Sequence, residues 1–344
     1  MSFRRVYFVC RGCRKGAYGA DQRLGIRAGR SRQAERMLCL AGASWSYAAA
    51  SRYLDELSGL KVSPNTVRLV CQREAASIET WQANDPRASE KYRKTPGQDE
   101  FETDGTCVNT SHGWKEMRVG VFAKRVSGEP ATAAQWNTRK LPSPGARVAF
   151  AAIEDHETFA ARWPQVGSRL GIRSGAALDV LADGAPWIWE RIDYHFAFAR
   201  GTLDIFHALE HVSQTATTLF GEGTTATEQW RDRAREALLT QGWNGIQQLI
   251  AHARPMAVRA PQRRALDELS GYLRPHAGRL NYAQRLADGR PIGSGMIEGA
   301  CKNYIGRRLK QTSARWLIPN ANRMATLTAL VYADQWTDYW ATAA

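Results

Sequence analysis

The sequence predicts an all-α domain followed by a larger α/β domain that contains a helical insertion. Three observations support this order. Residues 31–80 show helical periodicity without strand signals. From residue 101 onward, apolar and polar residues alternate as they do in half-buried strands, and short apolar runs bounded by glycine follow. Residues 225–286 are entirely helical in pattern and precede one last helix.

The all-α domain, residues 31–80, is expected to contain three helices. Their starts and ends follow from capping signals: serine at the N-cap, proline in the first helical position, and glycine just past the end. These signals place the helices at Arg32–Ala41, at Ser46–Leu57, and from Ser63-Pro64 to about Ile78.

A short helix, a turn and a second helix that opens with Ser-Pro-Asn-Thr-Val-Arg are typical of a helix-turn-helix unit. In that interpretation the second helix contacts base edges or phosphates of DNA through Asn65, Thr66, Arg68 and Gln72. An ordinary three-helix packing element is the alternative, and the adjoining basic arm, residues 1–30, favours DNA binding. Residues 81–100 are polar, lack apolar periodicity and hold two prolines, so a linker is predicted there.

The α/β domain is expected over residues 101–335. Predicted strands lie at Phe101–Asn109, Lys115–Lys124, Arg147–Ile153, Ala177–Ala182 and Thr202–Phe206, and predicted helices at Glu157–Leu170, His207–Leu219 and Met296–Arg308. Three antiparallel strands, a helix, two further strands and a closing helix make the element order of a ribonuclease-H-like α/β fold. A helical insertion over about residues 212–290 would separate the last strand from the last helix.

Two basic blocks account for the whole net charge of +14, which results from 47 Lys and Arg against 33 Asp and Glu. Residues 1–36 hold ten basic and two acidic residues, and residues 299–333 hold six basic residues and no acidic one. Charge concentrated in this way is an electrostatic footprint for a polyanion, and double-stranded DNA is the expected partner. No basic run adjoins a hydrophobic anchor, so a membrane surface is the weaker expectation.

Composition excludes several classes of protein. Hydrophobic residues make up 44% of the 344 residues, so a mainly disordered chain is excluded. The longest apolar run, Val148–Ile153, is far shorter than the ~18–20 residues of a membrane span. The N-terminus lacks the apolar stretch of a secretory signal, and six cysteines, four of them isolated, make no disulfide framework. A cytoplasmic, nucleoid-associated protein is expected.

Three acidic residues stand where such a fold brings side chains together. Asp104 lies within the first strand, Asp183 just past the fourth strand, and Glu298 in the first turns of the last helix. Their carboxylates would converge at one edge of the sheet, where mutual repulsion calls for a divalent cation. Oxygen ligands favour Mg²⁺ or Mn²⁺, and two such ions can activate a water or a 3′-hydroxyl for attack on phosphorus. Each Asp-Gly taken alone could also be a plain turn.

Several motifs resemble prokaryotic insertion-sequence transposases of the ISKra type. The most specific is the run PIGSGMIEGACK at residues 291–302, followed by GRRLKQT at 306–312 and by Trp316. The segments ADGAPWIW at 182–189, LDIFHALEH at 203–211 and WKEMRVGV at 114–121 fit as well, as does Asp104-Gly105. The resemblance covers about residues 35–335.

The resemblance implies a DDE transposase in which Asp104, Asp183 and Glu298 form the metal-binding triad. It also implies kinship with Mutator-like transposases, whose Asp-x-x-His element matches Asp204 and His207 here. His207 would contact the scissile phosphate or a triad carboxylate, and Asp204 would orient it. Basic residues expected to position phosphates near the triad are Lys302, Arg307, Arg308 and Lys310.

Enzymes of this family bind the terminal inverted repeats of their element, cleave DNA there, and join the freed 3′-hydroxyl to a target. They generally work as dimers or larger assemblies, so a homo-oligomer is implied. Two alternatives stay open at this stage. One is a DNA-binding protein with a degenerate, inactive catalytic fold, and the other is a structure-selective nuclease.

One departure from the family concerns the N-terminus. Relatives of this type commonly begin with two Cys-x-x-Cys pairs, which would make a four-thiolate zinc site. This chain has one such pair, Cys10 and Cys13. A truncated N-terminus would explain the missing ligands, and zinc stays an open question. Cys39 and Cys71 are interpreted as helix-core thiols.

Two further features have competing interpretations. His207 and His211 are four residues apart on one helix, a spacing that metals use, but a positioning or hydrogen-bonding role for His207 is favoured. Trp187 and Trp189 follow the second aspartate closely. Core packing is the default for these two indoles, and stacking on a flipped transposon-end base is the alternative.

Overall fold

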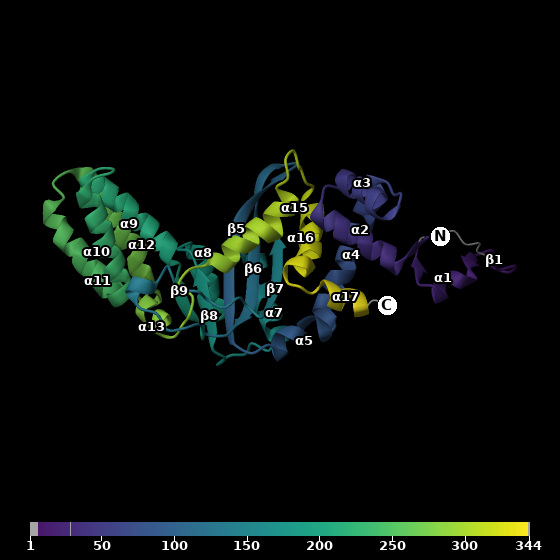
Figure 1. Cartoon of the computed structure of the whole chain (residues 1–344), viewed down its shortest axis with the longest axis horizontal. Helices are drawn as coiled ribbons and strands as arrows, with labels where there is room; N and C mark the ends of the chain where they lie inside the picture. Colours follow the sequence, from purple (N-terminus) through teal and green to yellow (C-terminus); the bar gives the residue numbers. More distant parts are fainter. Residues whose placement is uncertain (1–5, 28, 343–344) are drawn as a thin grey trace. The chain divides into compact units, whose positions relative to one another are not determined.

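The computed structural model describes residues 6–27 and 29–342. The chain forms two compact units, drawn in Figure 1. The helical unit combines the described residues of 1–88 and 303–344 with residues 108–115. The sheet unit combines residues 89–107 with residues 116–302. Each unit is therefore assembled from segments that lie far apart in the sequence.

Five strands form a mixed sheet in the order β7-β6-β5-β8-β9. β5 is parallel to β8 and β8 is parallel to β9, whereas β6 is antiparallel to β7. The strands are β5 (Gln98–Thr110), β6 (Gly113–Arg125), β7 (Ala146–Ala152), β8 (Leu178–Ala182) and β9 (Arg200–Leu203). All five strands expected from the sequence are confirmed, with ends shifted by a few residues. The α/β class is confirmed as well.

One face of the sheet is covered by an apolar core. Side chains alternate between the two faces along each strand, and Phe101, Phe122 and Val180 point to the same face. There they pack with Phe159 and Trp163. The helices that supply this cover are α6 (His156–Ala160), α7 (Arg162–Leu170) and α8 (Pro186–His195). Alternation leaves the other face of β5 to its acidic side chains, which form the candidate site.

Helices follow β9 and form a bundle with a core of its own, coloured green in Figure 1. They are α9 (Ile205–Phe220), α10 (Thr225–Gln241), α11 (Trp243–Ala253), α12 (Ala260–Leu273) and α13 (Tyr282–Ala287). Val212, Trp230, Leu238, Ile250 and Leu266 are buried together in this core. Residues 225–286 are thus mostly helical, as their pattern predicts. None of the helices in the described ranges is long and apolar enough to cross a membrane.

Helices of the helical unit confirm the capping signals except at the end of the first helix, which was predicted to end at Ala41 before Gly42 but continues to Ser44. Ser46 and Ser63 accept hydrogen bonds from the first turns of their helices, Pro64 stands in the first helical position, and Gly59 ends its helix with a φ of 65°. Only glycine adopts that left-handed backbone without cost. The helices are α2 (Arg32–Ser44), α3 (Tyr47–Ser58), α4 (Pro64–Asn84), α16 (Ile318–Tyr332) and α17 (Trp336–Thr342).

Cysteine placement agrees with the sequence interpretation where the thiols are buried. Cys39 and Cys71 are buried among α2 and α4, and burial raises the pKa of the Cys39 thiol. Both are therefore core thiols. Cys10 and Cys13 are exposed in the turn of a short hairpin, β1 (Tyr7–Val9) and β2 (Gly16–Tyr18). After this hairpin, the predicted basic arm contains α1 (Gly19–Arg23) and β3 (Ile26–Arg27), and β4 (Arg30–Ser31) lies at its end.

Residues 81–100, predicted to be a linker, contain the boundary between the two units after Ala88, but they hold more regular structure than their composition suggested. α4 continues to Asn84, α5 covers Arg87–Lys94, and β5 begins at Gln98. Trp81 and Tyr92 are both buried, although apolar residues in this stretch are too few to form a recognisable periodic pattern. The Tyr92 hydroxyl donates to Asp99 Oδ1 at 2.8 Å and lies 3.0 Å from Ala123 O.

The closing segment is helical as predicted for Met296–Arg308. It consists of α14 (Gly295–Ala300), a π-helical turn at Cys301–Gly306 and α15 (Arg307–Leu309), which follow one another without a break. The predicted catalytic domain ran to residue 335, whereas residues 303–344 belong to the helical unit. The cause is packing, because α16 lies against α2 and α4.

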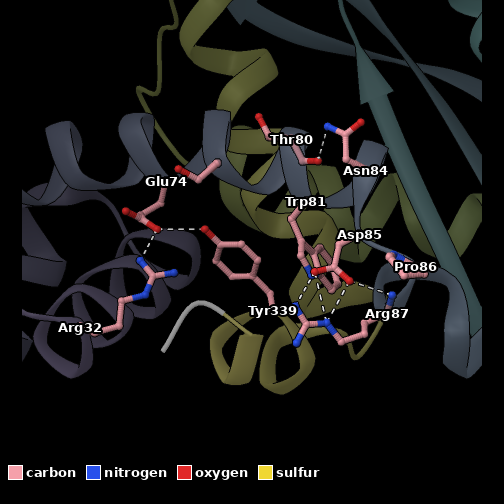
Figure 2. A pocket seen from close by; sticks show the side chains of 10 residues that line it. Arg32, Glu74, Thr80, Trp81, Asn84, Asp85, Pro86, Arg87 and Tyr339 are labelled. Atoms are coloured by element: carbon pink, nitrogen blue, oxygen red, sulfur yellow. Dashed lines mark hydrogen bonds and ion pairs between the residues drawn. The ribbon is translucent and has the colours of Figure 1, made fainter. Parts of the chain in front are cut away.

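An ion-pair cluster joins α17 to α4 inside the helical unit (Figure 2). Glu74 accepts hydrogen bonds from Arg32 at 2.6 Å, from Tyr339 at 3.0 Å and from Arg73 at 3.0 Å. A cavity of about 650 Å³ lies beside this cluster and is also lined by Asp85, which pairs with Arg87 at 2.6 Å. Its charged side chains are thus already paired with opposite charges.

Candidate catalytic site at the strand ends

The sheet register aligns three aspartates in one row. β5 pairs with β8 from Asp99 opposite Leu178 to Glu102 opposite Leu181. When this register is continued by two residues, Asp104 lies level with Asp183. β8 pairs with β9 up to Ala182 opposite Leu203, and one step further places Asp183 level with Asp204. Adjacent parallel strands therefore present the three carboxylates at one level.

Asp104 is half-buried, and its surroundings oppose ionisation. Burial and the nearby charge of Asp183 raise the pKa of Asp104 to about 6, although the Gly105 N–H and the charge of His207 act in the opposite direction. Gly105 N–H donates to Asp104 Oδ1 at 2.6 Å. A side chain at position 105 would collide with Glu116, because a Cβ there would lie 2.1 Å from Glu116 Oε1. A larger residue at position 105 would therefore require the Glu116 side chain, which is 45% exposed, to move.

The loop that holds Asp183 is fixed from several sides. Asp183 Oδ1 accepts from Ala185 N–H at 3.0 Å, and its carbonyl accepts from Trp189 Nε1 at 2.6 Å. Trp189 is buried in the sheet core, which confirms core packing for that indole. Tyr272 of α12 packs on Gly184 so closely that a Cβ there would lie 2.2 Å from its ring. The insertion thus contributes to the shape of this loop.

Asp204 is buried and fully engaged in hydrogen bonds. Its Oδ1 caps α9 by accepting from His207 N–H at 2.9 Å, and its Oδ2 accepts from Ser294 N–H at 2.5 Å and Ser294 Oγ at 2.6 Å. Burial alone would raise the pKa of Asp204, but these hydrogen bonds outweigh it and lower the pKa. Asp204 therefore connects the end of β9 to the segment that starts α14.

His207 lies one turn into α9 and is partly exposed. Its Nδ1 is 3.3 Å from Asp204 Oδ1. The hydrogen bond and charge of Asp204, together with the charge of Asp183, raise the pKa of His207 to about 9 despite partial burial. The ring is thus a cation at neutral pH, in contact with one aspartate of the row. This is the Asp204–His207 pairing that the sequence predicted.

Glu298 is carried on α14 (Gly295–Ala300), and strand β5 anchors the start of that helix. Buried Glu102, on the same face of β5 as Asp104, accepts the Ile297 N–H at 2.7 Å. Glu298 follows directly and is about 40% exposed, with its Oε2 3.5 Å from Lys302 Nζ. Lys302 therefore lies beside Glu298, as the sequence predicted. Arg307, Arg308 and Lys310 belong to the helical unit.

Carboxylate oxygens are the ligands that hard divalent cations such as Mg²⁺ prefer, and the negative charge of the carboxylates favours such an ion. Asp104 and Asp183 are level on adjacent strands, and the charge of Asp183 contributes to the raised pKa of Asp104, an effect that a cation between them would relieve. Glu298 would be the third oxygen ligand. Within residues 6–27 and 29–342, no three His, Cys, Asp or Glu side chains already stand close enough to hold one ion.

The predicted DNA-contacting residues lie along α4. Arg68 donates to Asn65 Oδ1 at 2.6 Å and to Gln72 Oε1 at 3.1 Å, so these three side chains form one polar row. Thr66 Oγ1 lies 3.0 Å from the N-cap Ser63 Oγ. Arg307 and Lys310 are exposed, whereas Arg308 is buried.

His211 and Trp187 have packing partners near the site. The His211 ring stacks on Tyr272 with ring centroids 3.7 Å apart, and burial lowers the pKa of His211. His211 and His207 therefore have different partners, and the pair makes no metal site in this structure. Trp187 packs against the sheet core and lies under the Arg118 guanidinium at 5.3 Å.

Sequence reasoning missed three residues that shape the site: Glu102, Ser294 and Tyr272. A signal existed for Glu102, because Glu100, Glu102 and Asp104 alternate along one predicted strand and must share a face. Ser294 lies inside the motif PIGSGMIEGACK, but nothing in the sequence indicated that its hydroxyl binds Asp204. Tyr272 lies in the helical insertion, where no local pattern connects it to Asp183. Comparison with protein-family models and with curated proteins found no match for the chain.

Proposed function

We propose that this chain is a DNA transposase that binds the ends of its insertion sequence and catalyses metal-dependent cleavage and strand transfer. The observation that carries the proposal is the row of Asp104, Asp183 and Asp204 at the ends of parallel strands, with Glu298 on a helix anchored to the same sheet. The sheet order, third-second-first-fourth-fifth, is that of a ribonuclease-H-like fold, and the resemblance to ISKra-type transposases points to the same class.

The acidic residues would hold the metal, and their neighbours would position the DNA. Asp104, Asp183 and Glu298 are the proposed ligands of Mg²⁺ or Mn²⁺. Bound there, the divalent ions would lower the pKa of the attacking oxygen and stabilise negative charge on the phosphate. His207, held by Asp204, would donate to a phosphate oxygen. Lys302 beside Glu298 would offset the charge of the DNA.

The chemistry consists of two displacements at phosphorus. In the first, a water oxygen bonds to phosphorus at the element's end and the bond to the 3′-oxygen breaks, which leaves a 3′-hydroxyl and a 5′-phosphate. In the second, that 3′-hydroxyl attacks a target phosphodiester and displaces its 3′-oxygen. The proposed partners are double-stranded DNA and further copies of this chain, in the cytoplasm at the nucleoid. We propose that the polar row of α4 binds the element's ends as the second helix of a helix-turn-helix unit.

The test is cleavage of the native DNA that flanks the coding sequence, labelled and incubated with the full chain and Mg²⁺. Asp104→Asn, Asp183→Asn and Glu298→Gln should each abolish cleavage while end binding is retained. Glu236→Gln, on an exposed face of α10, is the matched control and should cleave like wild type. Cleavage at the wild-type rate by any of the three would remove that residue from the site.

The same experiment separates the two alternatives. Binding without cleavage by the wild-type chain would favour a DNA-binding protein with an inactive catalytic fold. Cleavage confined to branched substrates, with no joining to a target, would favour a nuclease. Products joined through a 3′-end to target DNA support the transposase.

A further inference from the structure

A second cavity of the helical unit has the chemistry of an anion site. Its volume is about 540 Å³, and it lies among the start of α3, the first half of α4 and the segment between α15 and α16. Arginines from α4, from α15 and from the segment between α15 and α16 line it, and none of the described residues lining it is acidic. The side chains that matter are Tyr47, Arg68, Gln72, Arg308, Arg315 and Trp316.

Arg308 is the unusual member of this set, because it is buried without a counter-charge. Its side chain is only 3% exposed. Its guanidinium lies between the rings of Tyr47 and Trp316, at 4.8 and 4.9 Å from their centroids, and its Nε donates to Gly42 O at 2.6 Å. No ion pair to it occurs within the described part of the chain. Buried charges are normally paired, since an unpaired charge loses its hydration without compensation.

Two buried donors beside Arg308 also lack partners. Gln72 Oε1 accepts from Arg68, which fixes the orientation of the amide and leaves Gln72 Nε2 buried with no acceptor. The Tyr47 hydroxyl is likewise buried and makes no hydrogen bond with the described residues. A buried cation, an unused amide N–H and an unused hydroxyl therefore all belong to residues that line this cavity. Their common complement is an anionic group with several acceptor oxygens.

We propose that this cavity binds a phosphodiester group of a DNA strand. The inference rests on the proposed function, because the polar row of α4 supplies Arg68 and Gln72 to the cavity and Asn65 to the neighbouring surface. A phosphate in the cavity would fix the position of α4 on DNA without reading its sequence. Arg308, Gln72 and Tyr47 would donate to its oxygens. Arg315, which donates to Ser111 O at 3.1 Å, would add positive charge.

The competing explanation is structural: Arg308 would serve only to join α15 to the carbonyl of Gly42. The two accounts differ in what Gln72 does. A purely structural Arg308 gives Gln72 Nε2 no role beside the bond that Gln72 Oε1 accepts from Arg68, whereas a phosphate site uses this free N–H. Gln72→Leu removes that donor at nearly constant size and keeps the net charge, so it tests the site without removing the buried guanidinium.

The experiment measures binding of the full chain to a labelled duplex of random sequence over a range of salt concentrations, with thermal melting of each variant. Arg308→Gln should weaken binding about ten- to a hundredfold, the size expected for lost hydrogen bonds to a charged group. It should also lower the slope of log Kd against log salt by about one. Gln72→Leu should weaken binding about three- to tenfold with an unchanged slope, because it removes no charge.

Arg264→Gln is the matched control, since it removes an exposed arginine from the sheet unit and should change binding little. If Arg308→Gln melts far below wild type, the Gln72→Leu result decides. Wild-type affinity in Gln72→Leu, with a wild-type chain that binds DNA, would overturn the phosphate site and leave the proposed function standing. A wild-type chain that fails to bind duplex DNA at low salt would overturn the proposed function and the site with it.

Discussion

Glu102 accepts the backbone N–H of Ile297 at 2.7 Å inside the sheet unit. The contact joins residues almost two hundred positions apart and fixes the start of α14 against the strand that carries Asp104. Burial and the neighbouring charge of Glu100 raise the pKa of Glu102 to about 8, so the carboxyl is mostly protonated at neutral pH. Its role is therefore to position Glu298 rather than to add charge.

Substitution of Glu102 should separate positioning from charge. Glu102→Gln keeps an acceptor oxygen for Ile297 N–H and should retain stability and DNA cleavage within a few-fold of wild type. Glu102→Leu leaves that N–H buried without an acceptor, which costs about 1–3 kcal/mol of unfolding free energy. We expect cleavage by the Leu variant to fall about tenfold or more per folded molecule, measured beside denaturant unfolding. Equal cleavage by the two variants would contradict a positioning role.

His207 is expected to act on the DNA, not on the fold. His207→Ala should reduce strand transfer by roughly one to two orders of magnitude, the size typical of lost acid–base or supporting contacts. Because the side chain is 39% exposed and Asp204 would still cap α9 through the backbone, the melting temperature should change little. Cleavage and joining rates per folded molecule are the measurement. A large loss of stability with an unchanged rate would show that His207 is a packing residue.

Buried charges near the start of β8, at the opposite end of this strand from Asp183, should contribute to stability rather than to catalysis. Asp179 is buried on β8, where Arg200 donates to it at 3.0 Å and Arg285 lies 3.4 Å away. Arg285 also donates to Pro291 O at 2.6 Å, just before the segment that starts α14. Arg285→Met should lower the free energy of unfolding by about 3–5 kcal/mol, because it leaves Asp179 under-compensated.

The control for this prediction is Arg264→Met, an exposed arginine on α12 whose loss should cost well under 1 kcal/mol. Denaturant unfolding measures both variants. Similar stability of the two would show that Arg200 and Arg290 are sufficient to compensate Asp179.

The sequence could predict the strands, the caps and the aspartates because each has a local signal. Alternation marks β5 and β6, Ser63-Pro64 marks the start of α4, and Asp183 sits at the end of an apolar run. The register that aligns Asp104 with Asp183 depends on strand pairing across the chain, and no local pattern encodes it. The partners of Asp204 at Ser294 and of Glu102 at Ile297 are non-local for the same reason.

Unit boundaries were harder, because they depend on which apolar faces meet. α16 packs on α2 and α4, so the helical unit is incomplete without its C-terminal segment. A fragment that ends after α4 would lose this packing. DNA-binding experiments therefore need the full chain.

Acid should weaken the helical unit through Glu74. This side chain is buried, which alone would raise its pKa, but hydrogen bonds from Arg32, Arg73 and Tyr339 outweigh burial and lower it. A carboxyl with a pKa lower in the folded state than in the unfolded chain binds fewer protons when folded. Its contribution to stability is therefore complete above its ordinary pKa of 4.5 and is lost as the pH falls through the folded value.

Glu74→Gln should accordingly be less stable than wild type at neutral pH, by about 1–3 kcal/mol for the lost charged hydrogen bonds, and the difference should shrink toward low pH. Thermal melting of the full chain from pH 7 down to below 4.5 measures this difference in stability. Glu56→Gln, an exposed glutamate on α3, is the control and should follow the wild-type curve. Parallel melting curves for Glu74→Gln and wild type over the whole pH range would show that Glu74 ionises alike in both states, and the cluster with Arg32 and Tyr339 would then contribute no acid sensitivity.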